Sequence, residues 1–319
     1  MTTSGTENGA SATGNWVTLE GFTDRLDKTE FEGEFVGNFS GLARDPLGRI
    51  AALSDRSVLF FLDPETLTPL ERIRLRDELR QPIDCEALAF DQDEILVISE
   101  KPEIYRFDAA GKLLGVLPVP PQFRVTPVGQ ARFNEVFEGM TLTPDGGTLI
   151  ASMENALLTD APDILRFPTW ERVDPDEEFK PAAQYCYRVD SGLLVSDIAT
   201  TGDGRLFVIE RGFDSTGNTI RLYLADLRDA RDVNEIEELG PDAPVVPKQL
   251  LVDMVDLPPS GAVAKQPQVN PLLGNIEAMT MLDPGPDEQT RLLLVTDDNA
   301  SESQITRFYT LLVTLPPLT

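Results

Sequence analysis

Histidine is absent from the 319 residues of the chain, and this absence removes whole classes of chemistry. No Ser-His-Asp or Cys-His nucleophile can form, and no zinc or iron site can be ligated by histidine. The chain also has no Gly-x-Ser-x-Gly segment, the motif that carries the nucleophile in many serine hydrolases. Any catalysis must therefore rely on Asp, Glu, Lys, Arg, Tyr, Ser, Cys or a bound metal.

Cysteine and basic residues are scarce. Cys85 and Cys186 form no Cys-x-x-Cys pair, and we expect two free, buried thiols. The 27 Lys and Arg are outnumbered by 54 Asp and Glu, which gives a net charge of −27. Nucleic acids and anionic membranes need a basic surface, so neither is an expected partner. No apolar run reaches 18 residues, and no membrane insertion is expected.

One pattern occurs five times along the chain. A small or acidic residue precedes a short apolar strand, a turn rich in Gly, Pro or Asp follows, a second apolar strand ends at an acid, and a third strand carries Arg or an aromatic residue. The copies begin at residues 40, 86, 138, 197 and 277, and a fourth strand follows several of them. Four short strands per repeat at this spacing predict the blades of an all-β propeller.

The two ends of the chain suggest how the ring closes. The fifth copy runs out at Leu315, and the segment from Trp16 to Glu20 could supply its missing strand and leave no open edge. This interpretation gives five blades, although residues 225–275 could hide a sixth. We expect residues 1–14 to be a disordered tail and residues 15–319 to form one propeller domain.

Acidic residues occupy corresponding places in the repeats. Strands one and two form a hairpin, so the start of one and the end of the other should meet at the same end of the channel. The acids at the starts of the first strands should form an inner ring at this mouth, namely Glu86, Glu138, Asp197 and Glu277. The acids at the ends of the second strands should form an outer ring, namely Asp55, Glu100, Glu154, Glu210 and Asp297 or Asp298.

Clustered carboxylates must take up protons, pair with bases or bind a cation. Three bases follow ring acids directly, namely Arg56, Lys101 and Arg211, and Asn155 and Asn299 could add amide oxygens. Oxygen ligands without Cys or His favour Ca²⁺, with Mg²⁺ or Mn²⁺ less suitable. The alternative is that these acids are salt-bridged caps that only stabilise the repeat.

Several segments carry a family resemblance. The stretches SGLARDPLGRIAALSD, FEGMTLTPDGGTLIASMEN and VSDIATTGDGRLFVIERG, together with others between about residues 35 and 312, resemble the phytase-like family described as "esterase-like activity of phytase". More distantly, the chain resembles calcium-dependent propeller phytases and lactonases. This resemblance implies a metal held by Glu86, Glu138, Asp197 and Glu277, and a place outside the cytoplasm. Ser40 departs from the pattern because the other copies have an acid there.

The sequence therefore predicts a Ca²⁺-dependent hydrolase of phosphate esters or related small esters, acting as a monomer. Glu154 or Glu210 would be the general base, and Arg211 or Arg56 would stabilise the developing anion. Two alternatives stay open. One is a non-catalytic propeller that binds a ligand or protein and holds a structural cation, and the other is an enzyme similar to gluconolactonases. Fold alone does not separate them.

Overall fold

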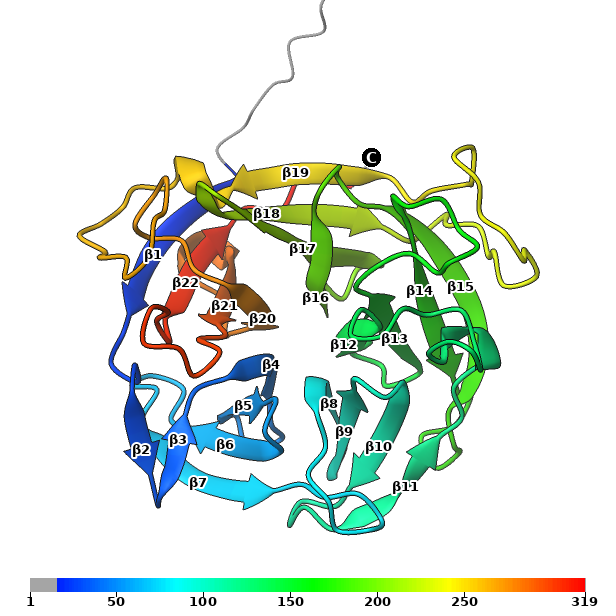
Figure 1. Cartoon of the computed structure of the whole chain (residues 1–319), viewed down its shortest axis with the longest axis horizontal. Coiled ribbons are helices and arrows are strands. Elements are labelled where there is room, and N and C mark those ends of the chain that lie inside the picture. Colours follow the sequence, from blue (N-terminus) through cyan, green and yellow to red (C-terminus); the bar gives the residue numbers. More distant parts are fainter. Residues whose placement is uncertain (1–15, 319) are drawn as a thin grey trace, which may run out of the picture.

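The computed structural model describes residues 16–318. Five antiparallel sheets of four strands surround a central channel and form a five-bladed propeller (Figure 1). The predicted all-β propeller is confirmed, and residues 225–275 contribute to the fourth blade and a connection rather than to a sixth blade. The predicted tail at residues 1–14 lies outside the described residues.

Each blade is numbered by its order in the chain, and its strands run outward from the channel. Blade 1 consists of β4 (Phe39–Arg44), β5 (Ile50–Ser54), β6 (Val58–Leu62) and β7 (Pro69–Arg74). Blade 2 consists of β8 (Cys85–Asp91), β9 (Glu94–Ser99), β10 (Glu103–Phe107) and β11 (Leu113–Leu117). Blade 3 consists of β12 (Phe137–Leu142), β13 (Thr148–Met153), β14 (Ile164–Glu171) and β15 (Lys180–Arg188).

The last two blades complete the ring. Blade 4 consists of β16 (Leu194–Thr200), β17 (Arg205–Asp214), β18 (Gly217–Asp226) and β19 (Lys248–Asp253). Blade 5 consists of β20 (Ile276–Met281), β21 (Thr290–Thr296), β22 (Phe308–Val313) and, on the outside, β1 (Val17–Thr23). Because β1 comes from the start of the chain and pairs with β22, the predicted closure is confirmed.

Few elements lie outside the blades. A small hairpin pairs β2 (Thr29–Phe31) with β3 (Glu34–Val36), and short 3₁₀ turns occur at η1 (Pro121–Phe123), η2 (Met254–Asp256) and η3 (Pro286–Glu288). Within residues 16–318 no helix has the length and apolar character needed to cross a bilayer.

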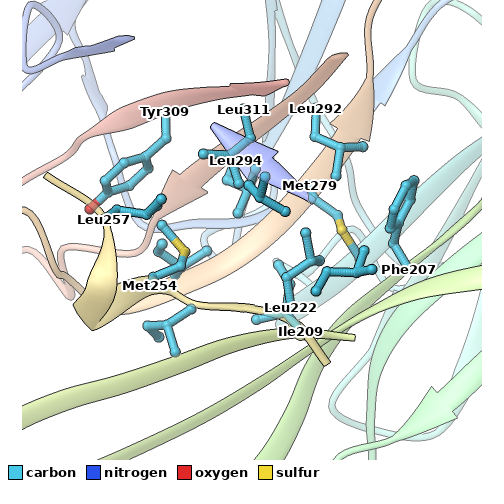
Figure 2. Close-up of a cluster of buried hydrophobic side chains, with 14 of the residues drawn as sticks. Phe207, Ile209, Leu222, Met254, Leu257, Met279, Leu292, Leu294, Tyr309 and Leu311 are labelled. Carbon is cyan, nitrogen blue, oxygen red and sulfur yellow. The ribbon is translucent and has the colours of Figure 1, made fainter. Parts of the chain in front are cut away.

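The core lies between blades. Five clusters of buried apolar side chains each combine residues from two neighbouring blades. Figure 2 shows the cluster between blades 4 and 5, where Phe207 and Ile209 of β17 meet Met279 of β20 and Leu292 of β21. Blades therefore bury both faces of each sheet, which explains why second strands such as Ile50–Ser54 are apolar throughout.

The two cysteines lie apart within this core. Cys85 begins β8 in blade 2, and Cys186 lies in β15 in blade 3. Both are buried free thiols, as the sequence predicted.

Candidate functional site

A β-bulge near the start of every innermost strand defines the inner ring. The pairing register of the first two strands shifts by one residue in each blade, between Phe39 and Gly41 in blade 1 and at the corresponding place in the others. A bulge leaves its extra residue out of the ladder and re-aims its side chain. The bulged residues are Ser40, Glu86, Glu138, Ser196 and Glu277.

This register corrects the expected inner ring in blade 4. The bulged residue there is Ser196, and Asp197 lies one residue further along β16. The buried carboxylate of Asp197 accepts hydrogen bonds from the backbone N–H of Ile198 at 2.8 Å and of Met279 at 2.6 Å. Asp197 therefore links blade 4 to blade 5 and does not join Glu86, Glu138 and Glu277.

The two serines of the inner ring also join blades. The Ser40 hydroxyl donates to the carbonyl of Cys85 at 2.5 Å, and the Ser196 hydroxyl donates to the carbonyl of Ile276 at 3.1 Å. Each carbonyl belongs to the residue just before a bulged glutamate, Glu86 or Glu277. The serines thus position the neighbouring acids.

The outer ring takes one residue from the end of each second strand. In blade 1 the residue before the bulge, Phe39, pairs with Ser54, and the ring residue is the next one, Asp55. The backbone N–H groups of its acids donate to carbonyls across the hairpin, as Asp55 does to Asn38 at 2.9 Å and Glu154 does to Val136 at 2.7 Å. In blade 4 the residue at this position, opposite Leu194, is Arg211. The outer ring is therefore Asp55, Glu100, Glu154, Arg211 and Asp297.

Glu210 lies one residue too early to belong to this ring. It pairs with Val195, and its fully buried carboxylate forms an ion pair with Lys248. The same carboxylate accepts hydrogen bonds from the Tyr187 hydroxyl at 2.6 Å and the Asp190 N–H at 2.9 Å. The expected general base Glu210 is thus bound between blades 3 and 4, away from the mouth.

Arg211 is the basic centre of the carboxylate mouth, by which we mean the two rings together. Its guanidinium lies 3.3 Å from Glu154 Oε1 and 3.1 Å from Glu277 Oε1, and it donates to the Asn275 amide oxygen at 3.4 Å. Burial opposes its charge, but Glu277, Glu138 and Glu154 raise the pKa of Arg211 overall. The arginine therefore stays charged at every relevant pH.

The outer-ring acids hold their protons unusually tightly. Burial, as the largest cause, raises the pKa of Asp55 to about 6, of Glu100 and Glu154 to about 7, and of Asp297 to about 8. Neighbouring acids add to the effect, Glu154 on Glu100 and Glu277 on Asp297, whereas Arg211 lowers the pKa of Glu154. Two of these carboxyls thus titrate near neutral pH, where a general acid or base is most effective.

The inner-ring glutamates show the same electrostatics. Burial first, and then the charges of Glu100 and Asp84, raise the pKa of Glu86 well above its usual value. Burial and the charges of Glu86 and Glu154 do the same for Glu138. The acids of both rings therefore lie near enough to one another at the mouth to raise each other's pKa.

The donor set suits a hard cation in chemistry and charge. Oxygens of Asp55 and Glu100 are buried without a hydrogen-bond partner, and a buried unpaired carboxylate is costly. As the side chains stand, however, no three Asp, Glu or Cys side chains among residues 16–318 are grouped closely enough to ligate one ion. Binding Ca²⁺ here would need side chains of the rings to turn toward a common point.

The remaining predicted pocket residues lie at the rim. Arg56 and Lys101 are exposed, with Arg56 Nε 3.9 Å from Asp55 Oδ1. Asn155 donates to Glu135 at 2.9 Å, while the exposed Asn299 donates to Gln304 at 3.1 Å.

Asp298, expected as an alternative ring acid to Asp297, has a different role. Its buried carboxylate pairs with Lys28 and accepts from the Asn38 N–H at 3.0 Å. It therefore fixes the segment before β4 to blade 5.

Sequence reasoning missed Asp84, Glu135 and Asn275, which lie just before the inner strands. Asp84 raises the pKa of Glu100, Glu135 raises that of Glu154, and Asn275 contacts both Arg211 and Glu277. The position two residues before the bulge is Asn38, Asp84, Val136, Leu194 and Asn275 in the five blades. The polar residues among these were the available signal.

Comparison with protein-family models identifies the family of the chain. A family model described as "Phytase-like: Esterase-like activity of phytase" matches residues 34–300, most of the chain. The chain is thus a β-propeller of the phytase-like family, and the resemblance noted in the sequence is confirmed. The residues that match this family, 34–300, include both rings of the carboxylate mouth.

No curated protein matches the chain. Among solved structures, it is similar to the β-propeller domain of Cps50 (Swd1) from Myceliophteria thermophila, with 10% sequence identity and a TM-score of 0.41 over 85% of this chain and 82% of that one.

Proposed function

We propose that this propeller hydrolyses phosphate esters or related small esters at the carboxylate mouth, with Ca²⁺ as its cofactor. The observation that carries the proposal is the pair formed by Glu154 and Arg211. A carboxyl whose pKa is about 7 lies 3.3 Å from a buried guanidinium that stays charged. A proton acceptor tuned to neutral pH beside a fixed cation is the combination that ester hydrolysis requires.

The proposed reaction assigns one role to each partner. Ionised Glu154 accepts a proton from water, and the water oxygen attacks the phosphorus or carbonyl carbon. The N–H groups of Arg211 stabilise the negative oxygen that develops there. The bond to the leaving oxygen then breaks, and that oxygen takes up the proton that Glu154 had accepted, so that the alcohol leaves and Glu154 is ionised again. Arg56 and Lys101 at the rim attract the anionic part of a phosphate ester.

The choice of Ca²⁺ is supported by the carboxylate oxygens of the inner ring, which are ligands that this ion prefers. Glu86, Glu138 and Glu277 project from the bulges and would hold the ion, with Mg²⁺ or Mn²⁺ as poorer substitutes. When bound, Ca²⁺ would polarise the ester and reduce the repulsion among the carboxylates. Asp197, whose oxygens accept two backbone N–H groups, is not in this proposed set.

Hydrolysis of chromogenic esters tests the proposal. We expect wild-type protein in Ca²⁺ to hydrolyse at least one of 4-nitrophenyl phosphate, bis(4-nitrophenyl) phosphate and 4-nitrophenyl acetate. Glu154→Gln should lower kcat by about 100-fold or more, because the proton acceptor is lost. The control Glu65→Gln, at an exposed glutamate after β6, should retain full activity. Equal activity in both variants would contradict the role of Glu154.

Calorimetric titration tests the metal separately. Ca²⁺ added at pH 7 to EDTA-treated protein should bind and release protons, because it displaces them from carboxyls such as Glu154 and Asp297. Proton release appears as a heat that depends on the ionisation enthalpy of the buffer. Glu138→Gln should weaken binding, and absence of binding by wild-type protein would remove Ca²⁺ from the proposal.

Binding without turnover is the outcome that would favour a non-catalytic propeller with a structural cation. We further propose that the protein acts on a small ester as a monomer, and that it lies outside the cytoplasm, as its family resemblance suggests. Light scattering of the purified protein and fractionation of the cells that produce it test these two points.

A further inference from the structure

Two oxygen atoms at the mouth end of blade 1 are buried and accept no hydrogen bond. They are Oδ1 of Asn38, a residue that is 2% exposed, and Oδ1 of Asp55. Asn38 comes directly before β4 and Asp55 directly after β5, so the two residues are neighbours at the mouth. Burying acceptors without donors costs free energy, and a pair of such acceptors side by side indicates a binding site.

The side chain of Asn38 is held in one orientation. Its Nδ2 donates to Asp55 Oδ2 at 3.4 Å, and its backbone N–H donates to Asp298 Oδ1 at 3.0 Å. Its carbonyl accepts from the Asp55 N–H at 2.9 Å. The opposite orientation of the amide would set its oxygen against Asp55 Oδ2, and two acceptors repel. The amide oxygen is therefore fixed as a free acceptor beside Asp55.

The surroundings of these two oxygens are acidic. Asp297, directly after β21 in blade 5, is close enough to Asp55 for their negative charges to repel. Asp84 and Glu277 act on Asp55 in the same way. Arg56 Nε lies 3.9 Å from Asp55 Oδ1, beyond hydrogen-bond distance, and the side chain of Arg56 is 62% exposed. This part of the mouth thus combines free acceptors with negative charge that a distant, solvated arginine offsets only weakly.

The lysines on this side of the mouth pair with other acids. Lys28 forms an ion pair with the fully buried carboxylate of Asp298, and Lys265 forms one with Asp27. Among residues 16–318 neither lysine forms an ion pair with Asp55 or Asp297. The charge of these two acids is therefore left for a ligand to neutralise.

The atoms that would bind this ligand indicate a hard cation. Amide carbonyls and carboxylates are ligands of Ca²⁺, and water molecules complete its coordination shell of about six to eight oxygens. Mg²⁺ requires a nearly ideal octahedron, which suits ligands from three separate segments of chain less well. A site with two carboxylates and one amide also agrees with the finding that no three Asp, Glu or Cys side chains among residues 16–318 are grouped closely enough for one ion.

We propose a second Ca²⁺ site, in which Asn38 Oδ1, Asp55 Oδ1 and the carboxylate of Asp297 hold the ion between blades 1 and 5. Blade 5 is closed by β1, and the chain then passes through Asn38 into β4, so these are the first and last blades of the ring (Figure 1). An ion here fastens the two blades together. The site shares no ligand with the inner-ring glutamates proposed to hold Ca²⁺ for hydrolysis, so it does not depend on that reaction.

Calorimetric titration of EDTA-treated protein with Ca²⁺ tests the site, and thermal melting gives a second readout. Asn38 has a φ of 57°, which glycine adopts freely, so Asn38→Gly removes the amide oxygen without straining the backbone. This variant should bind one ion fewer than wild-type protein, or bind that ion about 10-fold or more weakly. Asn38→Asp keeps an oxygen at this position and adds charge, so it should bind Ca²⁺ at least as tightly as wild-type protein. Ca²⁺ should raise the melting temperature of Asn38→Asp and wild-type protein more than that of Asn38→Gly.

A matched control lies elsewhere at the mouth. Asn134 has a φ of 60° and is exposed, and Asn134→Gly should bind Ca²⁺ as wild-type protein does. Unchanged binding in Asn38→Gly, an equal loss in Asn134→Gly or in Asn38→Asp, or no binding by wild-type protein would overturn the proposal.

The variant Glu138→Gln separates the two proposed ions. It should weaken only the inner-ring ion and leave the ion that depends on Asn38. If the inner ring binds no Ca²⁺, wild-type protein should still bind one ion, which Asn38→Gly removes and Glu138→Gln does not. Loss of the Asn38-dependent ion in Glu138→Gln would overturn the proposal, because the two sites would then be one.

Discussion

At the scale of single residues, one position along a strand decides what an acid does. Glu210 and Arg211 are neighbours in β17, but the side chain of Glu210 is enclosed between blades while that of Arg211 reaches the mouth. Alternation along a strand sends successive side chains to opposite sides. A sequence alignment that is wrong by one residue therefore exchanges a structural acid for a functional base.

The ion pair of Glu210 with Lys248 predicts a large effect on stability. Glu210→Gln should lower the free energy of unfolding by about 3 kcal/mol, because it removes the fully buried charge that pairs with Lys248 and leaves the lysine only its partly exposed partner Asp190. Glu94→Gln, which breaks a half-exposed pair with Arg106, should cost under about 1 kcal/mol. Urea unfolding measures both values. Equal losses of stability in the two variants would contradict the stabilising role of this ion pair, and loss of turnover per folded Glu210→Gln molecule would show that Glu210 acts at the mouth.

Arg211 should control the proton affinity of Glu154. Burial raises the pKa of Glu154, and the arginine partly offsets that rise. Arg211→Gln should therefore move the acid limb of the rate profile to higher pH, by about one unit or more, and also lower kcat. The pH dependence of turnover measures the shift. A lower kcat with an unmoved limb would mean that Arg211 acts on the substrate alone.

At the scale of elements, the repeats could be recognised in the sequence because both faces of each sheet are buried between neighbouring blades. Apolar second strands, turns rich in Gly and Asp, and a strand from the start of the chain that completes the last blade follow from simple periodicity, and the structure has them all. The bulges were not readable, because a bulge adds one residue without changing the hydrophobic pattern. Asp197 was misplaced for this reason, and Ser196 was overlooked.

The outer ring shows the same limit. Asp55, Glu100 and Glu154 were identified because an acid ends each of these second strands, and Asp297 was one of two choices with Asp298. Arg211 was expected to stabilise the developing anion, but it was placed beside a ring acid, Glu210, rather than in the ring itself, since nothing in one sequence says that a blade replaces its acid by an arginine. Asp84 and Asn275 share the position two residues before the bulge, but that position is polar in only three of the five blades, which is a weak signal, and Glu135 lies outside it.

The closing strand β1 makes a prediction about folding. It supplies the outer strand of blade 5, and Val17 packs in the core between blades 4 and 5. Removing residues 1–23 should expose the edge of β22 and lower the melting temperature by about 10 °C or more, with increased aggregation. Circular dichroism and light scattering during heating measure both. An unchanged melting temperature would show that ring closure contributes little to stability.

At the scale of the whole molecule, folding brings together carboxyl groups at the mouth that repel one another when they are ionised. Burial raises the pKa values of Asp55, Glu100, Glu154 and Asp297 to between about 6 and about 8. The folded protein thus binds protons more tightly than the unfolded chain does. The resulting stability is fully present below about pH 4 and is lost as the pH rises through 6 to 8.

This linkage predicts how melting depends on pH. In EDTA, the contribution of these carboxyls should make the melting temperature at pH 5.5 exceed that at pH 8.5 by at least about 2 °C. Asp297→Asn should reduce the difference, because it removes the carboxyl with the highest pKa of these four, about 8. Ca²⁺ should also reduce it by stabilising the ionised form. A melting temperature that rises from pH 5.5 to pH 8.5 in wild-type protein and in Asp297→Asn alike would contradict this electrostatic account.

The pH dependence of kcat/KM for a soluble chromogenic ester tests the central claim most directly, since it reports the proton acceptor of the free enzyme. For wild-type protein in Ca²⁺ we predict a rate that rises with pH and levels off above an inflection near the Glu154 pKa of about 7, and a profile without this inflection for Glu154→Gln. A wild-type rate that is flat between pH 5 and pH 9, or an inflection that persists in Glu154→Gln, would contradict the assignment of hydrolysis to the carboxylate mouth.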